Sequence, residues 1–317
     1  MKIHAILGYL LLLILLTSCN SHSHHIEFKI ELDGNDTQQD LSILKERIYE
    51  LSGEQAEIIT LPHSVYHFKL KSFQDSSLLY QAIQTQGDFE ICESYGLLEL
   101  YPILMKLNTE LIGSNSLPAF RLIDTSEFVK NNPLFSILMP NTTEETSLVS
   151  GTPIIGYVLS KDTSTLFQLF NLTSSKLLLP RGLTFELGKL INEQVYPIYA
   201  KKYKQDDDSN INEQMFEKVS VGKAEDRDDF EINITLKDPF KKKFSDLTKR
   251  NIQKSLIMSF DHTVLSAPIV QSEISGGRLI INSNFNHQEA FLIAACLKYG
   301  VLSKKPKVLD FAFVKNN

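Results

Sequence analysis

The sequence contains no tryptophan and only three cysteines among its 317 residues. Basic residues are not in excess, since 32 Lys and Arg stand against 38 Asp and Glu. No apolar run reaches the roughly 20 residues that a membrane-spanning helix needs. These absences argue against a multi-spanning membrane protein, and they leave no electrostatic reason to bind nucleic acid or an anionic membrane face.

The composition suits a globular protein. Hydrophobic residues make up 43% of the chain and charged residues 22%, which provides a buried core and a wetted surface for one large domain or two small ones. No nucleophile elbow, phosphate-binding loop or zinc-hydrolase spacing occurs in the sequence. We therefore expect a protein that is not an enzyme and takes no cofactor, metal or small-molecule substrate.

The N-terminus has the pattern of a lipoprotein signal. Lys2 precedes the apolar run Ala5–Leu16, which is too short for a stable membrane span, and Leu16-Thr17-Ser18-Cys19 follows the lipobox pattern. We expect residues 1–18 to be a signal peptide and residues 19–25 to be a polar tether. We also expect Cys19 to carry acyl chains such as palmitate, because several chains on one residue give a stable anchor. An ordinary cleaved signal with an accidental cysteine is the alternative.

Lipidation of Cys19 predicts a periplasm-facing protein of the bacterial cell envelope, with the lipid bilayer as a partner. Asn20 is not the Asp-type signal for inner-membrane retention, and no acidic run follows it, so we favour the outer membrane. The tether also contains His22, His24 and His25. A flexible tether does not preorganise metal ligands, so we expect no metal site there.

The two other cysteines are predicted to be buried. Cys296 lies in the apolar run Phe291–Gly300 of an expected helix, and Cys92 lies in a short strand-like run. Export would permit a disulfide between them. Free cysteine commonly behaves as a small buried hydrophobe, however, so two buried thiols are favoured over a bridge.

The N-terminal third predicts a ferredoxin-like subdomain. Alternating and helical periodicities give the order β-α-β-β-α-β, which is the ferredoxin-like pattern. The expected elements are a strand at Ile26–Leu32, a helix carrying Leu41 to Leu51 before Gly53, strands at Glu57–Leu61 and Val65–Leu70, a helix at Ser76–Gln84 and a strand at Phe89–Cys92.

The C-terminal third also has clear elements, whereas residues 101–203 are rich in Leu, Pro and Asn and are hard to assign. In that middle part we expect only a strand at Ile154–Leu159 and a helix at Thr163–Phe170. Beyond it we expect a helix that Asp238 caps, with Pro239 at its first position, and a second helix at Glu289–Tyr299. The expected strands are Glu231–Leu236, Ser255–Phe260, Val264–Val270, Leu279–Asn282 and Lys307–Val314.

Two motifs in this last third carry a family resemblance. The segment Leu265–Val270 contains Ser266-Ala267-Pro268, and Ile274-Ser275-Gly276-Gly277 follows before the Ile281–Phe285 segment. At this spacing the region resembles the first periplasmic domain of SecD and fused SecDF proteins. Since Pro, Ala and Gly carry no reactive group, we interpret Ser266, Ala267, Pro268, Gly276 and Gly277 as structural.

The resemblance implies an α+β fold with a ferredoxin-like base at residues 26–100, completed by 305–315, and a P1-head-like α+β subdomain at 101–304. His262, Gln253 and Ser283 stand where the family favours Gly. The family also continues into membrane helices, whereas this chain stops at Asn317, so we expect a lipid anchor in their place.

The resemblance further implies an accessory module of protein export that binds exported or unfolded polypeptide, or components of the Sec translocon. Which residues bind the polypeptide is left open at this stage. The alternative is a structural adaptor that kept the fold and docks another envelope complex without binding peptide.

Overall fold

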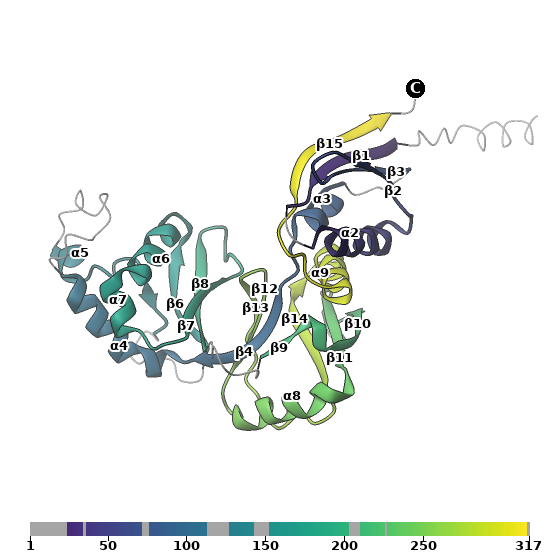
Figure 1. Cartoon of the computed structure of the whole chain (residues 1–317). Coiled ribbons are helices and arrows are strands. Elements are labelled where there is room, and N and C mark those ends of the chain that lie inside the picture. The colour runs from purple at the N-terminus through teal and green to yellow at the C-terminus, as the bar shows by residue number, and fades with distance from the viewer. Residues whose placement is uncertain are drawn as a thin grey trace, which may run out of the picture. The chain divides into compact units, whose positions relative to one another are not determined.

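The computed structural model describes residues 24–33, 36–71, 76–112, 127–142, 152–202, 210–225 and 227–315. The predicted lipid-bearing Cys19 lies outside the described residues. The chain divides into two compact units, one made of Met1–Gln86 with Leu302–Asn317 and the other of Gly87–Val301 (Figure 1). No helix among the described residues is long and apolar enough to cross a membrane.

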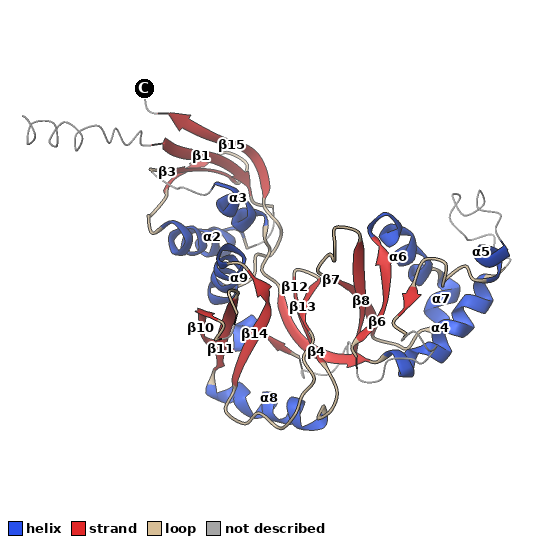
Figure 2. Ribbon diagram, turned by 180° about the vertical axis from the view of Figure 1, so that it is seen from behind, coloured by secondary structure: helices blue, strands red, loops and turns tan. Residues whose placement is uncertain are grey.

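The first unit is a four-stranded sheet with two helices on one side (Figure 2). The strands are antiparallel in the order β15-β1-β3-β2. Alternation buries Ile26, Phe28 and Ile30 of the central strand against the helices and leaves Glu27 and Lys29 on the open face. The elements are β1 (His24–Glu31), α2 (Thr37–Ser52), β2 (Glu57–Leu61), β3 (Val65–Leu70), α3 (Ser76–Gln84) and β15 (Lys307–Lys315).

The chain leaves and re-enters this first unit at one point. The backbone N–H of Leu302 donates to the carbonyl of Gln86 at 2.9 Å. The fully buried Arg47 of α2 donates to the carbonyls of Thr85 and Gln86 at 2.7 and 2.8 Å. Asp40, also in α2, accepts the N–H of Ser303 at 2.8 Å. The second unit is therefore an insertion whose two ends are held together by hydrogen bonds.

The prediction that the strand at Phe89–Cys92 completes the first sheet is wrong. This strand, β4 (Phe89–Tyr95), belongs to the second unit, where it pairs with three other strands. The edge of β1 is occupied by β15 instead. Alternation identifies a strand but not its partner, so the border between the units lies after Gln86 rather than near residue 100.

The second unit contains an eight-stranded sheet in the order β5-β6-β8-β7-β13-β12-β4-β9. An additional pairing of β8 with β4 closes β4, β8, β7, β13 and β12 into a ring. The strands are β4, β5 (Met139–Pro140), β6 (Ile154–Leu159), β7 (Leu183–Gly188), β8 (Val195–Lys202), β9 (Ile211–Asn212), β12 (Leu256–Phe260) and β13 (Thr263–Ser266).

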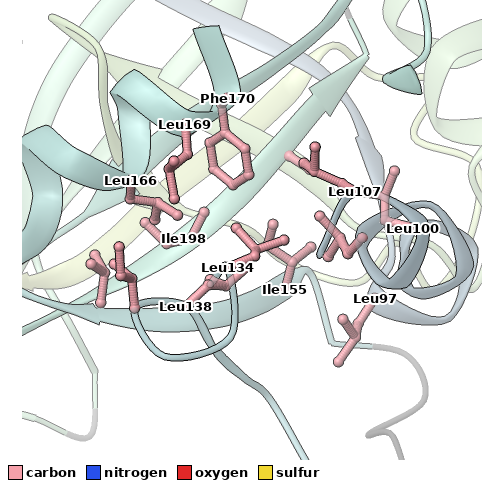
Figure 3. Close-up of a cluster of buried hydrophobic side chains, with 14 of the residues drawn as sticks. Leu97, Leu100, Leu107, Leu134, Leu138, Ile155, Leu166, Leu169, Phe170 and Ile198 are labelled. Carbon is pink, nitrogen blue, oxygen red and sulfur yellow. The ribbon is translucent and has the colours of Figure 1, made fainter. Parts of the chain in front are cut away.

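The helices Leu97–Leu111, Thr163–Asn171 and Thr173–Leu178 pack around one end of this sheet, and their core holds most of the leucines of the middle region. Figure 3 shows Leu97, Leu100 and Leu107 on one side of Ile155, with the α6 side chains opposite. The sequence left α4 unassigned, although its buried residues recur at helical spacing. The helices are α4 (Leu97–Leu111), α5 (Glu127–Asn131), α6 (Thr163–Asn171) and α7 (Thr173–Leu178), with 3₁₀ turns at Ser160–Asp162 and Glu213–Met215.

The second unit also contains an antiparallel three-stranded sheet, β10-β11-β14. A capping box between Asn286 and Glu289 begins α9, which packs on this sheet. Asp238 is the first residue of α8 and makes no capping hydrogen bond with its side chain, so the predicted cap is wrong by one residue. The elements are β10 (Phe216–Lys223), β11 (Phe230–Leu236), α8 (Asp238–Arg250), β14 (Arg278–Phe285) and α9 (His287–Tyr299).

Two further predictions have clear outcomes. Cys92 and Cys296 are both free and buried, so the preference for two buried thiols is confirmed. Burial raises the pKa of the Cys92 thiol, which keeps it protonated and unreactive. The strand predicted at Val264–Val270 is shorter, since β13 ends at Ser266 and residues 267–270 continue as an extended segment.

The turn between β12 and β13 holds His262 in a strained conformation. Asp261 and His262 have φ angles of 45° and 61°, a backbone region that favours glycine. The Asp261 carboxylate accepts the N–H groups of Gly87 and Asp88, each at 2.8 Å.

We expect His262→Gly to raise the free energy of unfolding by about 1 kcal/mol, because it removes the strain of a positive φ. Asp261→Gly should instead lower the free energy of unfolding. It also removes the strain of a positive φ, but it loses the two hydrogen bonds that the Asp261 carboxylate accepts. Urea unfolding followed by circular dichroism measures both. A less stable His262→Gly would mean that the contact of His262 with Glu186, at 3.7 Å, outweighs the strain.

Candidate functional site

The second unit contains an apolar groove, which we define by the residues that line a hollow of about 520 Å³. Three parts of the chain contribute to it. The first is β11 and β14, with Asn233, Thr235, Arg278 and Ile280; the second is β12 with the segment Pro268–Ser272; the third is α8, with Phe244 and Thr248. The groove lies entirely within this unit, where Figure 1 shows β14 and β11 across from β12 and β13.

Exposed aliphatic side chains gather in the apolar groove. Ile269, Ile274 and Ile280 are 40%, 37% and 53% exposed, and all three line it. Pro268 adds further apolar surface, and the largely buried Met258 lies behind it in the lining. Exposed apolar residues that cluster in a concave site, rather than scatter singly, are typical of a binding surface.

The register of the three-stranded sheet explains why Ile280 is exposed. Leu279 and Ile281 lie opposite Ile234 and Ile232, and all four are buried. Ile280 lies opposite Asn233 and points to the other face. The consecutive apolar run Leu279–Ile281 is thus a sequence signal for a strand with apolar residues on both faces.

One edge of β14 has no hydrogen-bonded strand partner among the described strands, although β13 lies near part of this strand. Among the described strands, β14 pairs only with β11, so the backbone groups of its other edge have no strand partner there. An unpaired edge accepts an extended segment by main-chain hydrogen bonding. The groove therefore combines an apolar hollow for side chains with a strand edge that can form main-chain hydrogen bonds.

The family model for the P1 head subdomain of SecDF matches residues 193–304. Every residue that lines the apolar groove lies inside this range. Residues 193–304 are thus similar to the SecDF P1 head family. The resemblance to SecD and SecDF that the sequence indicates is confirmed for this region.

The curated relatives of this chain are longer proteins. The protein translocase subunit SecD of Syntrophobacter fumaroxidans is 38% identical over 69 residues, which is 22% of this chain and 13% of that protein. Protein translocase subunit SecDF of Thermus thermophilus is 32% identical over 80 residues, 25% of this chain and 11% of that protein. The chain thus spans only a small part of the length of the curated relatives it matches.

A solved structure of SecDF, described as a membrane component that enhances protein export, is similar over 90% of this chain and 98% of its own. Its TM-score is 0.47 and its sequence identity 15%.

Of the five motif residues singled out in the sequence, Pro268 lines the apolar groove. Its carbonyl accepts the N–H of Leu256 at 3.1 Å. Gly277 has a φ of 62°, and a Cβ there would lie 2.5 Å from Cγ of Lys241. Ala267 packs on the buried Cys92, Ile257 and Val264.

The other two motif residues have no such role in the groove. Ser266 pairs with Met258 in the ring, and Gly276 has nothing near its missing Cβ. Pro268 is thus the one residue of these five that lines the groove. Ile269 and Ile274, which belong to the same two motif segments, and Ile280 provide the exposed apolar surface.

A buried charged cluster lies inside the ring of strands; we call Lys201, Glu90, Glu186 and Ser259 the Lys201 cluster. Lys201 donates to Glu90, to Glu186 Oε1 at 2.6 Å and to Ser259 Oγ at 3.4 Å. These four residues come from β8, β4, β7 and β12. Burial alone would lower the pKa of Lys201, but its hydrogen bonds to Glu186 and Glu90 raise it overall, so the ammonium stays charged.

The Lys201 cluster offers no evident chemistry. Its groups hold one another, and the charged Lys201 ammonium offers Ser259 no base. No group of three metal-ligating side chains occurs in the part of the chain that the structure describes. We therefore assign it a role in holding the ring of strands together and place the candidate function in the apolar groove.

Proposed function

We propose that this protein is an accessory binding module of protein export that takes extended segments of exported or unfolded polypeptide into the apolar groove. The observation that carries the proposal is the clustering of half-exposed aliphatic side chains beside the edge of β14 that has no strand partner among the described strands, within residues similar to the SecDF P1 head family. The SecD relatives are translocase subunits, which favours this kind of partner, together with components of the Sec translocon.

Binding of this kind requires no specific sequence. An extended segment that pairs with the edge of β14 obtains main-chain hydrogen bonds whatever its side chains are. Alternate side chains of the segment then enter the apolar groove, where burial of apolar area supplies the free energy. The result is weak binding that tolerates many sequences, which suits a module that binds many different exported polypeptides.

Within this proposal the first unit is the base and the second unit is an inserted α+β head. The order β1-α2-β2-β3-α3-β15, with antiparallel neighbours β15-β1-β3-β2, has the connectivity of a ferredoxin-like sheet. We further propose that acyl chains on Cys19 hold the protein on the periplasmic side of the outer membrane.

The groove can be tested with Ile280→Asn. We expect the affinity for a reduced, alkylated and fluorescently labelled polypeptide to fall about tenfold, because burial of the exposed half of this side chain supplies about 1.4 kcal/mol. Fluorescence anisotropy with the purified full chain measures it. Leu177→Asn is the matched control, since Leu177 is 81% exposed in α7 of the same unit and does not line the groove.

The alternative of a structural adaptor makes the opposite prediction. Gln253 and His262 have positive φ angles of 64° and 61° at positions where the family favours Gly, which is consistent with relaxed constraint on this region. An adaptor should show no measurable affinity for the unfolded polypeptide, while in-cell crosslinking should recover one stoichiometric partner. If Ile280→Asn and Leu177→Asn bind the unfolded polypeptide with equal affinity, the groove is not the binding site.

A further inference from the structure

One charged side chain at the apolar groove has no partner among the described residues. Arg278, the first residue of β14, is the only charged residue among the described residues that line it. Its side chain forms no hydrogen bond or ion pair with another residue that the structure describes. The formal charge of the whole chain is −6, so the charge at the groove has the opposite sign to that of the protein.

Arg278 and Ile280 lie on the same face of β14. Alternation along the strand places residues two positions apart on one side. The register agrees, because Arg278 lies opposite Thr235 and Ile280 lies opposite Asn233, and all four line the groove. The groove thus presents a cation and an aliphatic side chain about 6.6 Å apart along the strand.

A segment bound along β14 has the same alternation, so its side chains two positions apart face the groove together. An apolar residue of the segment then meets Ile280 while its neighbour two positions away meets Arg278. A carboxylate at that second position pairs with the guanidinium, whereas a lysine is repelled by it. Opposite charges here discriminate between segments more than they add affinity.

We infer that the groove selects extended segments in which an Asp or Glu side chain lies two positions from a large apolar residue, and disfavours segments with Lys or Arg there. This inference rests on the proposed function. We call this preference for an acidic over a basic residue the charge rule. Without it, the groove would select segments by their apolar residues alone.

The inference can be tested with three short peptides that differ at one position. Each carries the same apolar residue, with Glu, Gln or Lys two positions from it, and each is acetylated and amidated so that its termini carry no charge. With the purified full chain we expect affinity to decrease from Glu to Gln to Lys by up to about fivefold at each step, the upper range for exposed ion pairs. The differences should shrink at high salt.

Two variants of the full chain separate the charge rule from other causes. Arg278→Glu should reverse the order of the Glu and Lys peptides, and Arg278→Gln should abolish their difference. Arg181→Gln is the matched control, because Arg181 lies in the turn after α7 and does not line the groove. Circular dichroism checks that each variant is folded.

The outcomes distinguish this inference from the function on which it rests. Binding of all three peptides with equal affinity, or an order that Arg278→Glu leaves unchanged, would overturn the charge rule and leave the proposed function standing. If none of the peptides binds and unfolded polypeptide does not bind either, the proposed function fails and the inference fails with it.

Discussion

Replacing Lys201 by Ala is expected to lower the free energy of unfolding of the second unit by roughly 3–5 kcal/mol. Lys201 is 4% exposed and donates to the carboxylates of Glu90 and Glu186. Glu186 is 8% exposed, and its Oε2 atom has no hydrogen-bond partner among the residues that the structure describes. Removal of the ammonium leaves buried negative charge uncompensated, and an unpaired buried charge strongly destabilises the folded state.

The neighbouring Lys202 provides a matched control. Lys202 pairs with Glu99 at 3.1 Å, but its partner is half exposed, so Lys202→Ala should cost less than about 1 kcal/mol. Adding Glu186→Gln to Lys201→Ala should recover part of the loss, because it removes one unpaired charge. Since the chain has no tryptophan, urea unfolding is best followed by circular dichroism. Equal costs for Lys201→Ala and Lys202→Ala would refute the role given to the cluster.

The pH dependence of this stabilisation has a definite sign. Hydrogen bonds to Glu186 and Glu90 raise the pKa of Lys201 in the folded state despite its burial. A raised pKa means that the contribution is fully present below the unfolded pKa of lysine and is lost only as the pH rises through the folded value. The difference between wild type and Lys201→Ala should therefore be constant around neutral pH and shrink in strongly alkaline solution.

Cys19→Ser is expected to abolish acylation of the protein completely. The expectation follows from the lipobox pattern Leu16-Thr17-Ser18-Cys19, because the Cys19 thiol is the group that would carry the lipid. Growth with a clickable palmitate analogue, followed by gel detection, should label the wild type and leave Cys19→Ser unlabelled. The variant should also migrate as a larger chain, because residues 1–18 stay attached.

Cys92→Ser controls for label on any other thiol. Cys92 is fully buried and its pKa is raised by burial, so this variant should keep the whole signal. Label that persists in Cys19→Ser and disappears in Cys92→Ser would contradict the lipid anchor at Cys19.

Local pattern predicts many elements of the structure well. The strands at Glu57–Leu61 and Val65–Leu70 and the helix at Ser76–Gln84 have the bounds expected from alternation, helical spacing and the Pro62-His63 turn. Each is determined by neighbours in sequence. The partner of Phe89–Tyr95 is not, because its pairings involve residues more than a hundred positions away.

The apolar groove could not be predicted from the sequence for a related reason. Its lining comes from β11, α8, β12, the Pro268–Ile274 segment and β14, and only the fold brings these together. The family motif marked Pro268, which lines the groove, and Gly277, which is close to Lys241. The run Leu279–Ile281 did signal an apolar residue on each face, but it could not show that one face stays open.

The hydrogen bond between Leu302 and Gln86 has a consequence for cooperativity. When the insert Gly87–Val301 is unfolded, the first unit can fold only by closing a loop of that length, at an entropic cost of about 4–5 kcal/mol from the logarithmic dependence on loop length. A folded insert presents its ends already juxtaposed and removes this cost. The order of folding is thereby biased, with the insert forming first and the host unit closing around its two ends afterwards.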